Sequence, residues 1–285
     1  MFRRSAFNII RDPILYLGRC AIFLFCNTIF ALVYLRARQY EQDQALNKMW
    51  LNIWLIAIPS NMGVVAVYAL NDEFKTILRE SKNGMVGPLS YVFAKSLLVI
   101  PIMFVFAIFA LAIPAFAIMD FPIETFGVAI ILWACLIFVF ECVAECLSVW
   151  FDDPILGMLQ FMNFWFGSFL FAGFLIPLRD MYWPFELFYY IMPYGYYLRS
   201  SMYNFLQDTT WDACDPGTNT ESAVCVTPPD GKEVLGGINL VYAIVDNEDT
   251  IAKDIGILLA IAFVYKFLYI VGVFYKTTKV ASINE

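Results

Sequence analysis

The sequence contains no histidine, and charged residues make up only 15% of its 285 positions. The lack of histidine excludes the histidine-ligated zinc sites of metalloproteases and the serine–histidine pairs of hydrolases. A G-x-x-x-x-G-K-[ST] phosphate-binding loop is also absent, because the Gly231-Lys232 pair lacks the first glycine of that pattern. We therefore predict that this chain has no catalytic site, expect no metal site that depends on histidine, and predict that it does not hydrolyse ATP alone.

Apolar residues take the place of the missing polar ones. They make up 61% of the sequence, with 28 Phe, 16 Tyr and 7 Trp. A helix needs about 20 mostly apolar residues to cross the hydrocarbon core of a bilayer. We predict an all-α polytopic membrane protein, a single domain over 1–285 with six transmembrane helices. The predicted spans are 14–35, 50–70, 90–117, 123–148, 156–177 and 253–275.

The charges are distributed unevenly along the chain. The segment from Leu178 to Asp254 carries twelve acidic and four basic residues, whereas the whole chain has a net charge of −7. The short segments on the same side of the membrane as the N-terminus hold eight Lys and Arg, and those on the opposite side hold three. Because cytosolic segments are enriched in Lys and Arg, we predict that both termini are cytosolic. The segment 178–252 is then a long extracellular loop, and its aromatic residues predict short re-entrant or interfacial helices.

Two polar stretches outside the spans have an amphipathic pattern. Residues 1–13 alternate basic and apolar positions, which suits a helix lying on the cytosolic membrane surface. Over 72–84, Phe74, Ile77 and Leu78 recur at helical spacing opposite charged residues. A short helix of this kind suits contact with a soluble partner, and a plain connecting loop is the alternative.

Polar residues also interrupt three of the spans. Pro59 removes a backbone hydrogen bond from the second span, and Asn61 either satisfies neighbouring groups or lines a cavity. In the fourth span Glu141 and Glu145 are four residues apart and share a helix face. Lys266 in the sixth span is a candidate partner. Proton coupling, metal binding and a structural ion pair remain open for these intramembrane charges.

The seven cysteines fall into two groups. Five lie within predicted spans, where a thiol usually acts as a small apolar side chain. Cys214 and Cys225 lie in the acidic loop, and an oxidising compartment would favour a disulfide between them. Two free loop thiols are the alternative.

Three short signatures follow one another along the chain. They are Arg11-Asp12-Pro13, the run from Glu73 through Arg79-Glu80 to Pro101, and Gly173-Phe174-Leu175-Ile176-Pro177. In order and spacing they resemble the transmembrane domain of G-type ATP-binding cassette transporters, the family that includes the pleiotropic drug resistance exporters. The resemblance covers essentially the whole chain.

The resemblance implies an ATP-driven exporter of amphipathic or lipid-like molecules (sterols, lipids or xenobiotics) in the plasma membrane. Such a protein works by alternating access with a nucleotide-binding domain, which is fused upstream or encoded separately. ATP and Mg²⁺ would bind to that domain. The other expected partner is a second transmembrane half, giving a homodimer or a pseudo-dimer.

The resemblance also assigns roles to individual residues. It places Ile58, Asn61 and Phe166 in the substrate cavity, Phe174 and Leu175 at the exit plug, Glu73, Arg79 and Glu80 in the coupling helix 72–84 that contacts the nucleotide-binding domain, and Cys214 and Cys225 in a disulfide-stapled outer loop.

Two rival functions also fit the residues. One is a non-transporting membrane scaffold, or a truncated partner subunit without an ATPase. The other is a proton-coupled carrier that uses Glu141, Glu145 and Lys266. Such a carrier would transport without ATP and would typically contain an internal repeat, which we do not find in the sequence.

Overall fold

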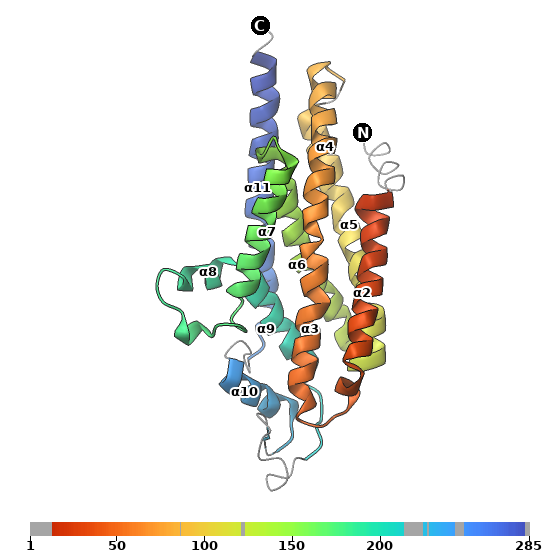
Figure 1. Cartoon of the computed structure of the whole chain (residues 1–285), viewed down its shortest axis with the longest axis vertical. Coiled ribbons are helices and arrows are strands. Elements are labelled where there is room, and N and C mark those ends of the chain that lie inside the picture. The colour runs from red at the N-terminus through yellow and green to blue at the C-terminus, as the bar shows by residue number, and fades with distance from the viewer. Residues whose placement is uncertain are drawn as a thin grey trace.

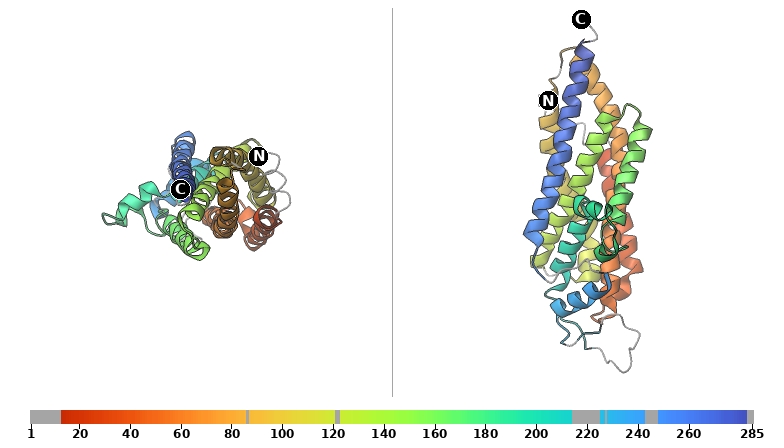
Figure 2. Two further views of the ribbon diagram at one scale, coloured as in Figure 1. Left: turned by 90° about the horizontal axis from the view of Figure 1, so that it is seen from above. Right: turned by 90° about the vertical axis from the view of Figure 1, so that its left-hand side faces the viewer.

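The computed structural model describes residues 13–85, 87–120, 123–213, 225–226, 228–242 and 248–282, and every named element in these ranges is a helix. The long helices run side by side along the long axis (Figures 1 and 2). They are α2 (Arg19–Val33), α3 (Gln44–Asn61), α4 (Gly63–Lys82), α5 (Pro88–Pro114), α6 (Ile123–Trp150), α7 (Pro154–Leu170) and α11 (Ile251–Ser282). The shorter ones are η1 (Pro13–Gly18), η2 (Leu35–Arg38), η3 (Ala115–Met119), η4 (Leu178–Asp180), α8 (Glu186–Ile191), α9 (Tyr194–Leu206) and α10 (Gly231–Tyr242).

Five helical segments of the described residues are long and apolar enough to cross a bilayer. They are Tyr16–Val33, Gln44–Lys82, Pro88–Ala117, Ile123–Trp150 and Ile251–Thr278. The predicted all-α membrane class is therefore confirmed, and five of the predicted spans have a counterpart. α7 covers most of the remaining predicted span but has only 17 residues, a rise of about 26 Å against a core of about 30 Å. A membrane crossing over 156–177 stays a prediction.

The second span extends further than its hydropathy suggested. Only Met62 separates α3 from α4, and α4 continues to Lys82, so the two form one rod in Figure 1. The predicted coupling helix 72–84 is the last part of α4 rather than a separate short helix. Its sequence contains no proline or glycine between Gly63 and Gly84. Gly84, with φ of +68°, lies just beyond the helix in the left-handed conformation that commonly ends helices.

The connections alternate between two ends of the bundle (Figure 1). The end of α4, the start of α5, the α6–α7 connection and the last turns of α11 lie at one end, which we call the α4 end. The α2–α3 connection and α10 lie at the other, the α10 end. η1 and the end of α11 point toward the α4 end. The predicted cytosolic location of the termini remains untested, and the predicted amphipathic helix 1–13 lies, except for Pro13, outside the described residues.

α6 is the central element of the bundle. It packs against α3, α4, α5, α7, α9 and α11, and it has the largest buried share of the five candidate spans. The ring of Trp133 is fully buried and meets that of Phe23 edge-on, at 5.9 Å between ring centres. Helices in lipid associate by close packing and by polar contacts rather than by hydrophobic burial. The charges on α6 therefore lie where several helices meet.

The segment 178–252 is partly inside the bundle. α9 packs against α3, α6 and α11, and most of its side chains, including those of Tyr194 and Tyr197, are buried. In contrast, α8 lies to the side of the bundle in Figure 1, and no residue of α8 is buried. The re-entrant nature predicted for these helices is not tested by this arrangement.

The junction of α3 and α4 packs closely against α7. A Cβ added at Gly63 would overlap the fully buried ring of Phe161. We expect Gly63→Ala to lower the free energy of unfolding by about 1–3 kcal/mol because the core is overpacked. Thermal unfolding in detergent measures this effect.

The matched control is Gly256→Ala in α11, where an added Cβ meets nothing within 4 Å. That change should leave stability equal or raise it by up to about 1 kcal/mol, since Ala is the better helix former. Equal unfolding temperatures for the two variants would contradict the packing described here.

Candidate functional site

A buried ion pair joins α2 to α6 toward the α4 end. Arg19 Nη1 lies 2.9 Å from Glu141 Oε2, and the two side chains are 2% and 1% exposed. Arg19 also lies over the rings of Phe23 and Phe106. Sequence reasoning proposed Lys266 as the partner of the paired glutamates and missed Arg19. The available signal was a lone arginine inside an apolar span.

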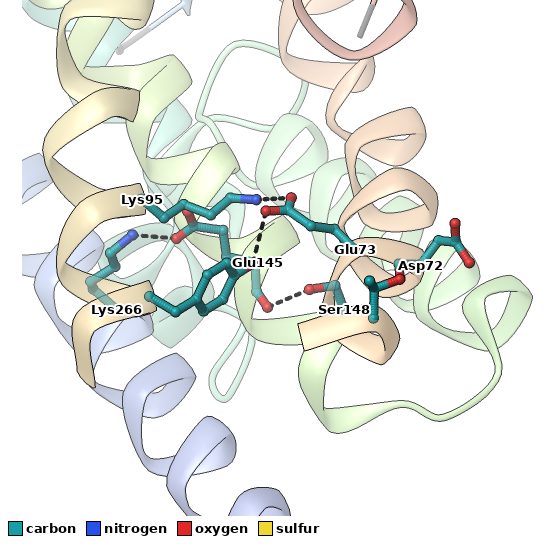
Figure 3. A network of polar contacts seen from close by, with 8 residues as sticks. Asp72, Glu73, Lys95, Glu145, Ser148 and Lys266 are labelled. Carbon is teal, nitrogen blue, oxygen red and sulfur yellow. Dashed lines mark hydrogen bonds and ion pairs between the residues drawn. The ribbon is translucent and has the colours of Figure 1, made fainter. Parts of the chain in front are cut away.

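A second ion pair joins α6 to α11. Lys266 Nζ contacts Glu145 Oε2, and the Glu145 side chain is 1% exposed (Figure 3). Ser148 Oγ donates a hydrogen bond to the backbone carbonyl of Glu145 at 2.7 Å. The two glutamates of α6 therefore reach different helices, Glu141 toward α2 and Glu145 toward α11.

A third ion pair joins α4 to α5. Lys95 Nζ contacts Glu73 Oε2, and Tyr91 OH donates to Glu73 Oε1 at 3.2 Å (Figure 3). The side chain of Glu73 is thus held within the chain. Of the other two predicted coupling residues, Arg79 is exposed and Glu80 is partly buried.

Each of these three pairs connects two helices. Arg19 Nε, Glu141 Oε1 and Glu145 Oε1 are buried without a hydrogen-bond partner among the described residues. No group of three His, Cys, Asp or Glu side chains in the described ranges is arranged to hold a metal ion. Because a buried charge that loses its partner is costly, each pair favours a fixed contact between its two helices.

The predicted cavity residues lie along the contact of α3 and α7. Trp165 Nε1 in α7 donates to Ser60 Oγ in α3 at 2.8 Å, which brings the neighbouring Asn61 and Phe166 to the same region. Phe166 is 58% exposed, and Ile58 and Asn61 are partly buried. They therefore lie on the outside of the single chain, so a cavity there would need a second half to enclose it.

The two predicted plug residues differ in burial. Phe174 is 3% exposed, and its ring meets those of Trp50 and Phe169 edge-on, at 6.0 and 4.8 Å. Leu175 is 47% exposed. Of the two, only Leu175 is exposed, and the plug itself stays a prediction.

Near the α10 end, polar contacts hold α9 against α11. Asp254, fully buried at the start of α11, accepts hydrogen bonds from Arg199 Nε at 3.0 Å, Ser200 Oγ at 2.6 Å and Thr250 Oγ1 at 3.1 Å. Sequence analysis counted Asp254 and Arg199 only as loop charges. Their pairing fixes α9 inside the bundle.

The connection between η2 and α3, together with the first turns of α3, contacts described residues of the segment 178–252 in two ways. Gln42 Nε2 donates to the carbonyls of Asp212 and Val226 at 3.2 and 3.1 Å, and Val226 N donates to Gln42 Oε1 at 2.7 Å. Lys48, 1% exposed, lies over the rings of Tyr40 and Trp211, at 4.7 Å from each ring centre.

Tyr40 belongs to this contact, and Cys225 precedes Val226 in the chain. Burial, together with the hydrogen bond donated to Asp120, raises the pKa of Tyr40. Cys214 lies outside the described residues, so its predicted disulfide with Cys225 stays a prediction.

The helix order and the intramembrane charges can now be compared with known families. The family model for the ABC-2 type transporter matches residues 1–206, most of the chain and the region up to the end of α9. This chain belongs to the ABC-2 type transporter family. A comparison with curated proteins finds no match.

Family membership gives the described helices their context. An ABC-2 transporter domain is the transmembrane part of an ABC transporter, an integral multi-pass membrane protein that associates with a nucleotide-binding domain. The G-type subfamily is a finer assignment that rests on the sequence resemblance. In this ABC-2 domain the ion pairs of Arg19, Lys95 and Lys266 lie toward the end of the bundle that contains the predicted coupling segment.

The buried pair Arg19–Glu141 allows a direct test of this arrangement. Glu141→Ala leaves Arg19 buried without a partner, so we expect a loss of about 3–5 kcal/mol in the free energy of unfolding. The double variant Arg19→Met/Glu141→Leu should lose much less, since no charge is stranded. Denaturant unfolding of the purified protein measures both changes.

The exposed pair Lys276–Asp152 serves as the control, because the Asp152 side chain is 95% exposed. Asp152→Ala should change stability by no more than about 1 kcal/mol. If the double variant at positions 19 and 141 were less stable than Glu141→Ala, the pairing would not be the source of the effect.

Proposed function

We propose that this chain is the transmembrane half of a G-type exporter that moves amphipathic or lipid-like molecules, such as sterols, lipids or xenobiotics. It works by alternating access, with a nucleotide-binding domain and a second transmembrane half, identical or related. The observation that carries the proposal is the helical rod from Gln44 to Lys82. Its 39 residues rise about 58 Å, so one element joins the candidate cavity to the α4 end.

The far end of this rod is anchored on one face and exposed on the other. Phe74 and Ile77 are buried in a cluster with side chains of α5, α6 and α11. Lys75, Arg79 and Lys82 on the opposite face are exposed. A partner that pushes on the charged face would therefore move α4 together with the helices against which it packs. This supports a role in receiving ATP-driven motion.

The Glu73–Lys95 pair adds to this transmission. It ties the same part of α4 to the start of α5, so Glu73 acts inside the chain rather than at the contact with the nucleotide-binding domain. In this proposal Arg79 and Glu80 provide that contact. ATP and Mg²⁺ bind only to the nucleotide-binding domain.

The substrate class follows from the surface around the candidate cavity. The exposed side chains on α7 include the apolar Leu159, Met162 and Phe166 and the polar Gln160 and Asn163, and Asn61 on α3 is partly buried. Ligand sites with mostly apolar walls and few polar anchors suit amphipathic molecules. Two such halves facing one another would enclose a slot of this character, with Leu175 near its outer end.

The orientation and the membrane belong to the same proposal. The excess of Lys and Arg in the short segments at the α4 end supports a cytosolic location of that end and of both termini. The 178–252 segment is then extracellular, where a Cys214–Cys225 disulfide is stable, and the plasma membrane is the expected location.

Arg79→Ala in the complete transporter tests the coupling role. We expect export per ATP hydrolysed to fall roughly tenfold, the effect of about 1.4 kcal/mol, while membrane insertion is unchanged. The physical reason is that a charged contact which transmits force is lost, whereas the exposed position does not support the fold. Parallel assays of ATP hydrolysis and of export, with sterol, phospholipid and drug panels, give the ratio.

The control is Lys232→Ala, which removes an exposed basic residue of α10 at the opposite end. It should leave the ratio unchanged. Normal export per ATP in Arg79→Ala would defeat the assigned role, and export that continues without ATP would favour a proton-coupled carrier.

A further inference from the structure

One side chain of α2 contacts the backbones of two other helices. Asn27 is fully buried, and its Nδ2 donates hydrogen bonds to the carbonyl of Leu55 in α3 at 3.1 Å and to that of Ala110 in α5 at 3.0 Å. An asparagine amide has two N–H donors, so each carbonyl receives one. A single side chain therefore joins α2, α3 and α5.

Both acceptors lie four residues before a proline. In an α-helix the carbonyl of residue i accepts from the N–H of residue i+4, so the partner of Leu55 would be Pro59 and that of Ala110 would be Pro114. Proline has no N–H to donate. Asn27 supplies the missing donor to both carbonyls.

Both prolines also lie where the helix changes its geometry. α3 ends two residues after Pro59, and α4 begins at Gly63. α5 ends at Pro114 and continues as the π-helix η3. Helices bend at prolines and at π-helical segments. Each proline therefore marks a hinge, and the two hinges are bonded to the same amide.

The contact also reaches the central helix of the bundle. Trp133 Nε1 of α6 donates to the Leu55 carbonyl at 3.4 Å. The hinge of α3 is thereby held against both α2 and α6. Asn27 is the side chain that links this hinge to the hinge of α5.

We propose that Asn27 is a positioning residue that makes the proline hinges of α3 and α5 bend together during transport. The inference rests on the proposed function, in which motion enters through α4 and reaches the candidate cavity through α3. Asn27 acts through the backbones of α3 and α5. When it is lost, α3 bends without α5, and ATP-driven motion of α4 opens the pathway less efficiently.

The variant Asn27→Leu in the complete transporter removes both donors and keeps the number and branching of the side-chain heavy atoms. We expect export per ATP hydrolysed to fall roughly tenfold, with ATP hydrolysis retained. In a Pro59→Ala/Pro114→Ala background the helices regain their own N–H donors. There the same change at Asn27 should alter the ratio by less than about twofold.

The control is Pro101→Ala, also in α5. Pro101 is exposed, and the carbonyl four residues before it belongs to Leu97 rather than to an acceptor of Asn27. In this background the full effect of Asn27→Leu should persist. The inference would be overturned if Pro101→Ala restored export per ATP hydrolysed in Asn27→Leu as fully as Pro59→Ala/Pro114→Ala does.

The same cycle measured by thermal unfolding separates this inference from the proposed function. Thermal unfolding needs no substrate, so it tests the double contact of Asn27 even if the wild-type protein exports nothing. A wild-type protein that exports nothing would count against the proposed function alone. If the changes in unfolding temperature caused by Asn27→Leu and by the proline substitutions are additive in every background, the inference is overturned. A loss of thermal stability in Asn27→Leu with normal export per ATP also overturns it, because the role would then be structural only.

Discussion

The absence of water in the hydrocarbon core governs this structure. Every backbone group there must find its partner within the chain, and every charge must be paired or displaced to an interface. Helices satisfy most of the backbone. Two exceptions are the carbonyls that Pro59 and Pro114 leave without a helical N–H donor, and Asn27 satisfies both. The buried glutamates of α6 follow the same constraint, each with a cation from another helix.

These polar contacts join neighbouring helices at defined positions in the bundle. The pairs at Arg19, Glu73 and Lys266 connect α2, α4, α5, α6 and α11 toward the α4 end. Near the α10 end, Asp254 holds α9 against α11. Between these regions the rod of α3 and α4 has one interruption, at Met62. In the proposed mechanism, a push on the end of α4 would therefore reach the candidate cavity through few joints.

Hydropathy alone predicted the membrane class and the positions of most long helices, because a long apolar run in a bilayer has few alternatives to a helix. It did not show that α4 continues through 72–84, since an amphipathic pattern marks a helix but not a break before it. The predicted span 156–177 combined residues 156–170 of α7 with the bend that follows. The depth of α9 in the bundle was also missed, because its burial depends on contacts with α6 and α11.

The partners of the buried polar groups could not be predicted for the same reason. Arg19 and Glu141 are 122 residues apart, so only the packing of α2 on α6 brings them together. A weaker signal was present. Arg19, Phe23, Asn27 and Ala31, the buried residues of α2, recur every four positions, and two of them are polar. This stripe indicates the face of α2 that turns toward the bundle, but not what it meets there.

The most direct test of the account is the location of the end of α4 in the complete transporter. An Arg79→Cys variant should react with a membrane-impermeant thiol reagent only after the cells are permeabilised. It should also form a cross-link to the nucleotide-binding domain, with a yield that changes when ATP binds. Reaction in intact cells, or no cross-link under any nucleotide condition, would contradict the claim that this segment receives the motion that drives export.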